Sequence, residues 1–138
     1  MLVHPGGPFW KNKDDGVWSI PKGEFTDDED PFGAARREFE EELGQPLPTG
    51  DVLLLTPVKQ NSGKTVYAWA VESDLDVTHV ISNTFRMEFP PKSRKWIDVP
   101  EVDKAAWFRV TVAKQKIIPG QKPLVDELIA RLDFRVSV

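Results

Sequence analysis

Apolar side chains recur with a helical period in the first third of the chain, at Phe32, Ala35, Phe39 and Leu43. Spacings of three and four place such side chains along one face of a helix, where they pack against a core. Asp30 precedes them as an N-cap, and Pro31 takes the first helical position, where a missing N–H costs nothing. Gly44 is suited to the C-terminal cap. This pattern predicts a helix over residues 31–43.

Runs rich in β-branched and aromatic residues predict strands at residues 2–3, 17–20, 51–59, 65–71 and 105–110. The segment 61–63, Asn-Ser-Gly, is a turn signal between the third and fourth runs and indicates a hairpin. Residues 82–100 are polar and contain two adjacent prolines, so we expect a long loop there, of the kind that is often functional. A short helix capped by Thr111 and a final amphipathic helix over 123–132 complete the predicted elements.

The predicted helix also carries three carboxylates, Glu38, Glu41 and Glu42, with no lysine between them. Offsets of three and four bring these side chains to one face of the helix, beside the apolar stripe rather than within it. Like charges held this close are costly unless a hard cation binds them. Mg²⁺ bound by a few carboxylates and by substrate phosphates is the usual arrangement for phosphoryl transfer. The segment therefore indicates metal-assisted cleavage of a phosphate anhydride.

Length and composition narrow the context of such a site. The 138 residues are 40% hydrophobic and 29% charged, which predicts one globular domain over residues 1–138. A net charge of −4 offers no broad attraction to nucleic acid or to an anionic membrane, so we expect neither as a stable partner. The absence of cysteine, of a membrane-length apolar run and of a signal peptide predicts a cytoplasmic protein. We expect a monomer or a homodimer.

The stretch from Gly23 to Gln45 resembles the motif of the Nudix hydrolases, G-x5-E-x7-R-E-U-x-E-E-x-G-U, in which U is a bulky apolar residue. The positions that match are Gly23, Glu29, Arg37, Glu38, Phe39, Glu41, Glu42 and Gly44. One position departs, because Gln45 replaces the last apolar residue, and this concerns packing after the helix rather than metal binding. The resemblance implies an α+β fold, an α/β/α sandwich around a mixed β-sheet.

The same resemblance implies a role for each polar position. The oxygens that bind Mg²⁺ or Mn²⁺ would come from Glu38, Glu41 and Glu42. The metal would neutralise a diphosphate and activate a water for attack on phosphorus. Arg37 and Glu29 would pair and hold the preceding loop against the helix. Gly23 would lie at the metal through its backbone, where a side chain would strain the site. For the carboxylates taken alone, the alternative is a solvated acidic helix face.

A second resemblance narrows the substrate. Residues 18–23, W-S-I-P-K-G, are similar to a segment of the diadenosine tetraphosphate hydrolases. It implies that Lys22 lies beside the phosphate chain, with a solvated loop lysine as the alternative. Lys64, Tyr67 and Trp69 resemble part of the adenine-stacking strand of that subfamily, on which the two aromatic residues would share one face. Core aromatics and a solvated hairpin lysine are the alternatives for these three residues.

Glu101 lies six residues before Trp107, a spacing similar to that of a glutamate that helps to bind metal or to position water in the same subfamily. Glu88 is the alternative from the preceding segment. Positive charge in that segment comes from Arg86, Lys92, Arg94 and Lys95. These cations either grip a distal phosphate or nucleotide or are simply solvated. His4 and His79 have no partner at metal-ligand spacing, and we interpret both as structural or surface residues.

Nudix domains usually begin with a strand and a hairpin ahead of the region that starts here, so an N-terminal edge strand is expected to be missing. Three explanations are considered: a shortened sequence, replacement by the strand-like residues 133–138, or strand exchange with a second copy. A helical tail would exclude the second explanation.

Together these features predict a metal-dependent hydrolase of a nucleoside diphosphate linked to another moiety. The favoured reaction is asymmetric hydrolysis of a dinucleoside polyphosphate such as diadenosine tetraphosphate. The first alternative is a pyrophosphohydrolase of nucleoside triphosphates or of RNA 5′ ends, and the second is a non-catalytic nucleotide-sensing domain. One of the carboxylates, Glu38, Glu41, Glu42 or Glu101, would take the proton from water, and the choice among them stays open.

Overall fold

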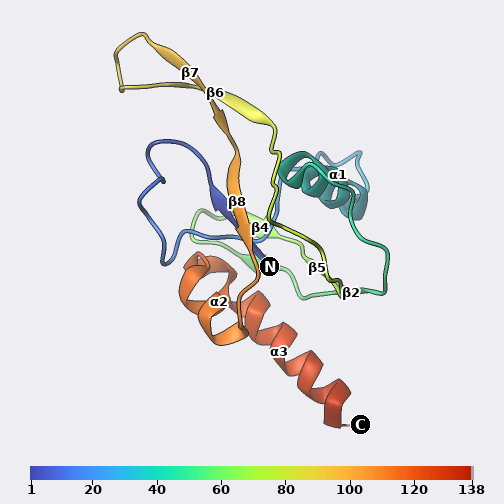
Figure 1. Ribbon diagram of the computed structural model, residues 1–138. Helices are drawn as coiled ribbons and strands as arrows, with labels where there is room; N and C mark the ends of the chain where they lie inside the picture. Colours follow the sequence, from blue (N-terminus) through green and yellow to red (C-terminus); the bar gives the residue numbers. More distant parts are fainter. Residues whose placement is uncertain (138) are drawn as a thin grey trace.

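The computed structural model describes residues 1–137, with side chains for residues 1–133. The helical elements are α1 (Pro31–Leu43), α2 (Val110–Lys116), the 3-10 turn η1 (Pro119–Gln121) and α3 (Lys122–Ser137). The strands are β1 (Leu2–Pro5), β2 (Val52–Leu54), β3 (Val58–Lys59), β4 (Thr65–Val66), β5 (Trp69–Val71), β6 (Thr84–Glu88), β7 (Trp96–Pro100) and β8 (Val102–Ala106). The chain therefore has the predicted α+β composition (Figure 1).

Within residues 1–137 the strands pair as antiparallel ladders, β1 with β8, β2 with β5, β3 with β4 and β6 with β7. They are separate two-stranded ladders rather than one continuous mixed sheet. The segment 17–20, predicted as a strand, joins them only through isolated bridges. Val3 bridges Ser19 in the antiparallel sense, and Trp18 bridges Ile117 in the parallel sense. The N-terminal strand thus lies between β8 and the segment that leads to the motif.

The two faces of β1 enter different hydrophobic clusters, because successive side chains of a strand point to opposite sides. The first cluster consists of Leu2, Trp18, Ala113 and Ile117. The second consists of Val3, Phe39, Leu43 and Val102. Helix α1 therefore covers one face of the β1–β8 ladder, and α2 covers the other (Figure 1). A third cluster, which joins α3 to the β2–β5 region, consists of Leu55, Ala68 and Leu124.

Helix α1 has the boundaries and the caps that the sequence predicts. The carboxylate of Asp30 accepts a hydrogen bond from the backbone N–H of Gly33 at 3.0 Å, and Pro31 is the first helical residue. Gly44 ends the helix with φ 72°, and its N–H donates to the carbonyl of Glu40. A Cβ at Gly44 would lie 2.4 Å from the carbonyl oxygen of Ile81, so only glycine fits between the helix end and this segment.

The prediction of a loop over residues 82–100 is wrong, because this segment is the β6–β7 hairpin. Its pairing places Phe85 opposite Val99 and Arg86 opposite Asp98. Apolar and polar side chains alternate along β6, so its polar residues form one face of a strand rather than a loop. The prolines lie in the turn between the strands, where they remove no ladder hydrogen bond. The hairpin projects away from the helices (Figure 1).

Other boundaries differ from the prediction. The runs 51–59 and 65–71 pair as the predicted hairpin, but each is divided into two short strands. Helix α2 has Arg109 rather than Thr111 as its N-cap, with no side-chain hydrogen bond. Helix α3 continues to Ser137, so the tail does not form an edge strand, and only Val138 lies outside the described residues. No helix in the described part of the chain is both long and apolar enough to cross a membrane.

Candidate metal and substrate site

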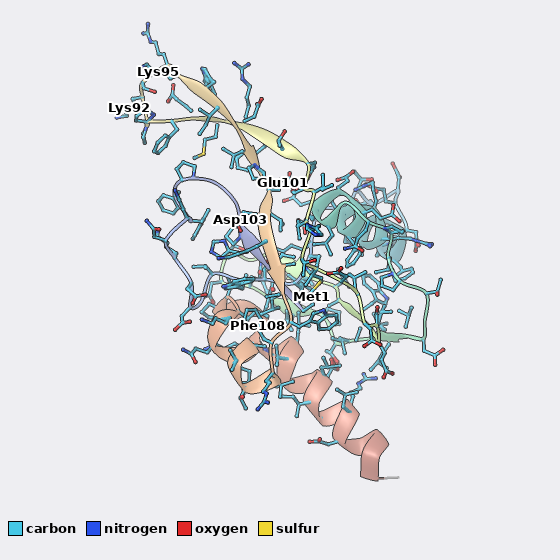
Figure 2. The ribbon with its side chains drawn as sticks, in the orientation of Figure 1. Met1, Lys92, Lys95, Glu101, Asp103 and Phe108 are labelled. Carbon is cyan, nitrogen blue, oxygen red and sulfur yellow. The ribbon has the colours of Figure 1, made fainter. Side chains whose placement is uncertain are left out.

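Three carboxylates from distant parts of the chain meet beside α1. Glu38 and Glu42 lie one helical turn apart on this helix, and Glu101 lies between β7 and β8. Each offers an oxygen, and these oxygens all lie within 4.8 Å of one another. Figure 2 shows Glu101 at the base of the β6–β7 hairpin, beside α1. The structure therefore places Glu101 beside Glu38 and Glu42 of the motif, where its spacing to Trp107 in the sequence predicts it.

The backbone of Asn83 holds Glu101 against the end of α1. Its N–H donates to the carbonyl of Glu41 at 2.8 Å, and its carbonyl accepts from the N–H of Glu101 at 3.0 Å. The carbonyls of the last helical turn have no partner within the helix, so this bond satisfies one of them. On the other side, the carbonyl of Glu101 accepts from the N–H of Gly6 at 3.1 Å. Glu101 is thus tied to both α1 and the N-terminal segment.

Glu42 is nearly buried, with 6% of its surface exposed. Its Oε2 accepts a hydrogen bond from the backbone N–H of Lys22 at 3.1 Å. Burial raises the pKa of Glu42 to about 7; the bond from Lys22 opposes this effect, and the charges of Glu101 and Glu38 add to it. Burial also raises the pKa of Glu38, against the hydrogen bond from Arg37. In two of the three carboxylates, Glu38 and Glu42, burial therefore makes the ionised form unfavourable when no cation is bound.

This donor set fits a hard divalent cation. Carboxylate oxygens are the preferred ligands of Mg²⁺ and Mn²⁺, and three of them converge here. A divalent cation would supply the positive charge that makes burial of the anions favourable. The chain itself supplies little positive charge to the buried Glu42, because its pKa is lowered only by the hydrogen bond from the Lys22 backbone and by the charge of Lys22. The residues present thus fit the metal that the motif implies.

Gly23 lies directly against the side chain of Glu38. A Cβ at this position would lie 2.0 Å from Cδ of Glu38, so any other residue would displace that carboxylate. The predicted contact of the Gly23 backbone with a metal stays a prediction. The structure explains why glycine is needed here, because a Cβ would overlap the side chain of Glu38.

Glu41, the third carboxylate of the motif, does not belong to the group. Its side chain is 42% exposed, and its Oε1 lies 3.8 Å from Nε of Arg37. Neighbouring positions on a helix are rotated by about 100°, which turns Glu41 away from Glu42. Arg37 also contacts Glu29 at 2.5 Å and Glu38 at 3.3 Å. The predicted Arg37–Glu29 pair is therefore present, and it connects the acidic loop to α1.

A cavity of about 360 Å³ adjoins Glu38 and Glu42, because Gly23 and Lys22, which lie against these two carboxylates, line it. The predicted substrate-binding residues Lys22, Lys64, Tyr67 and Trp69 all line it. The strand predicted over 65–71 is interrupted between β4 and β5, yet Tyr67 and Trp69 both line the same cavity. The ring of Tyr67 lies edge-on to Phe25 at 5.8 Å between centroids. We refer to this space as the Tyr67 cavity.

Lys22 also lines a second cavity, of about 250 Å³. Glu42 and Glu101 line it together with Trp10, and the rest of its wall is mainly apolar. We refer to it as the Trp10 cavity. Trp10 and Asn83 are the functional candidates that the sequence did not indicate, since both lie in irregular segments with no motif and reach the site only through folding.

The remaining candidates lie elsewhere. The carboxylate of Glu88 accepts the backbone N–H groups of Lys92 and Arg94 within the hairpin turn, at 2.8 and 3.3 Å. Lys92 and Lys95 lie at the far end of the hairpin from Glu101 (Figure 2). The buried His4 contacts Asp103 at 2.9 Å and the carbonyl of Lys13 at 2.7 Å, which agrees with a structural role.

Comparison with known proteins supports the interpretation of the motif. The family model of the NUDIX domain matches residues 2–128, nearly the whole chain. No curated protein and no solved structure matches the chain significantly. The match extends over every element described above except the last turns of α3. The chain belongs to the Nudix family.

Proposed function

We propose that this Nudix protein hydrolyses dinucleoside polyphosphates, of which diadenosine tetraphosphate is the model substrate, into two unequal nucleotides. The observation that carries the proposal is the meeting of Glu38, Glu42 and Glu101 beside a cavity lined by cationic and aromatic side chains. Carboxylates of this kind serve a metal, and aromatic rings serve a base. The site therefore suits a ligand that carries both phosphates and a base.

Glu38, Glu42 and Glu101 would hold Mg²⁺ or Mn²⁺, which when bound neutralises the phosphate chain and lowers the pKa of a water. The chain supplies the remaining interactions itself. Lys22 and Lys64 line the Tyr67 cavity and would attract phosphate oxygens, although Lys64 also pairs with Glu24 at the rim. Tyr67 and Trp69 would stack on the base.

Glu41 is our candidate for the proton acceptor. It is the one carboxylate of the helix motif outside the group of three, and it is exposed to solvent. A base must keep a lone pair for the proton that it takes, and a carboxylate outside the metal group meets that condition. Glu41→Gln should then retain Mn²⁺ binding and lose kcat. Glu42→Gln should lose both, and equal loss of Mn²⁺ binding in the two variants would contradict this assignment.

The second candidate is a pyrophosphohydrolase of nucleoside triphosphates or RNA 5′ ends. The observation in its favour is that the Tyr67 cavity, taken alone, offers aromatic rings for one base. The non-catalytic alternative has less support, because every charged position of the motif is present.

Product analysis separates these functions. The protein is incubated with Mg²⁺ and either diadenosine tetraphosphate, ATP or 8-oxo-dGTP, with Glu42→Gln as the control. ATP and AMP formed from the dinucleotide, and absent with the control, are expected. Faster turnover of a mononucleotide would favour the second candidate, and no turnover of any substrate would refute the enzymatic proposal.

A further inference from the structure

The Tyr67 and Trp10 cavities meet at one residue. Lys22 lines both of them, and its backbone N–H donates to Glu42. The next residue, Gly23, lines the Tyr67 cavity and lies against Glu38. The carboxylates Glu42 and Glu101 line the Trp10 cavity. The group of Glu38, Glu42 and Glu101 therefore borders the Trp10 cavity directly and adjoins the Tyr67 cavity through Lys22 and Gly23.

The residues that line the Trp10 cavity suit a nucleotide base better than a phosphate group. Apart from Trp10 its apolar lining consists of Val3, Pro5, Val17, Val102 and Ile118. Apolar walls cannot replace the hydration of a phosphate, whereas an indole ring can stack on any base. The volume of about 250 Å³ lies below the usual range for a complete ligand, so the cavity suits one part of a larger molecule.

Trp10 is held in position without any ligand. Its backbone N–H donates to the carbonyl of Gly7 at 3.2 Å, and its carbonyl accepts from the N–H of Lys13 at 2.9 Å. The ring of Phe9 lies edge-on at 4.9 Å, and the Lys13 ammonium lies 5.1 Å from the indole. The carbonyl of Lys13 also contacts the buried ring of His4. A platform ordered in advance binds with a smaller entropic cost.

We propose that the Trp10 cavity binds the second nucleoside of the substrate, so that the phosphate chain crosses the carboxylate group at Lys22 and each base occupies one of the two cavities. This inference rests on the proposed function and deepens it. It explains why a chain with this motif would prefer a dinucleotide, because a mononucleotide fills only one of the two cavities. Trp10 is then a residue that contacts the substrate and takes no part in the chemistry.

The experiment compares two substrates with the same number of phosphates. Diadenosine tetraphosphate carries the second nucleoside, and adenosine 5′-tetraphosphate lacks it. Trp10→Ala should lower kcat/KM for the dinucleotide by about 5- to 150-fold, the equivalent of the 1–3 kcal/mol that stacking of one base contributes. The same variant should leave kcat/KM for the mononucleotide unchanged. Trp10→Phe should restore most of the preference for the dinucleotide over the mononucleotide. Trp96→Ala removes an exposed indole outside both cavities and should affect neither substrate.

The outcomes distinguish this inference from the proposed function. Equal losses for both substrates in Trp10→Ala would give Trp10 a structural role and overturn the inference. Equal turnover of both substrates by the unaltered protein would also overturn it, and would leave the hydrolase intact. If no substrate is turned over, the proposed function fails. Calorimetric titration with both nucleotides in Mg²⁺ then tests whether the Trp10 cavity binds a second nucleoside. Tighter binding of the dinucleotide that depends on Trp10 would then support the second site, and any other binding result would overturn it.

Discussion

Replacement of Glu42 by glutamine should stabilise the metal-free protein at neutral and alkaline pH. Glu42 is 6% exposed, and burial raises its pKa from an ordinary value of 4.5 to about 7. Because this pKa lies above that of the unfolded chain, the native state binds more protons between the two values. The free energy of unfolding contributed by this group is therefore fully present below pH 4.5 and is lost as the pH rises through 7.

The size of the effect follows from the two pKa values. They differ by about 2.5, and about 1.4 kcal/mol corresponds to each pKa unit, so the charged form costs about 3.5 kcal/mol. Glutamine keeps an oxygen that can accept the N–H of Lys22 but carries no charge at any pH. For a chain of this length the melting temperature should rise by roughly 10 °C at pH 8.

The assay is urea unfolding between pH 4 and 9 in the presence of a chelator, followed by tryptophan fluorescence. The unaltered protein should lose stability relative to Glu42→Gln as the pH rises, and Glu40→Gln, an exposed change on the same helix, should match the unaltered protein. Added Mg²⁺ should reverse the order of the two stabilities, because glutamine is a poor ligand for this cation. Parallel pH profiles, or a less stable Glu42→Gln at pH 8 in chelator, would refute the reasoning.

Three further substitutions test residues around the group of Glu38, Glu42 and Glu101. Gly23→Ala should weaken Mn²⁺ binding and lower kcat because its Cβ would displace Glu38, whereas Gly33→Ala, where a Cβ has room, should leave Mn²⁺ titrations unchanged. Arg37→Met should lower kcat/KM by about 10- to 100-fold through loss of carboxylate orientation, with unaltered circular dichroism. Leu43→Ala, at a position 1% exposed, should cost about 2–5 kcal/mol in urea unfolding without altering metal affinity in the folded protein.

Local features of the chain determined α1 completely. The cap at Asp30, the proline that follows it and the glycine at 44 define the helix ends, because capping involves residues only a few positions apart. The offset of four between Glu38 and Glu42 also placed them on one face before any fold was known. The Arg-Glu half of the Nudix motif, residues 37–44, lies on this helix and its C-terminal cap, which is why both the family and the core of the candidate site could be predicted from the sequence.

The choice between Glu88 and Glu101 required the tertiary structure. Glu88 ends β6 and Glu101 lies between β7 and β8, but only Glu101 returns to α1, through the backbone of Asn83. The same packing formed the β6–β7 hairpin, left Glu41 outside the group and brought Trp10 beside Glu42. Contacts between residues far apart in the chain depend on how whole elements pack. Helical and strand periods record only neighbours a few residues away, and so they do not reveal these contacts.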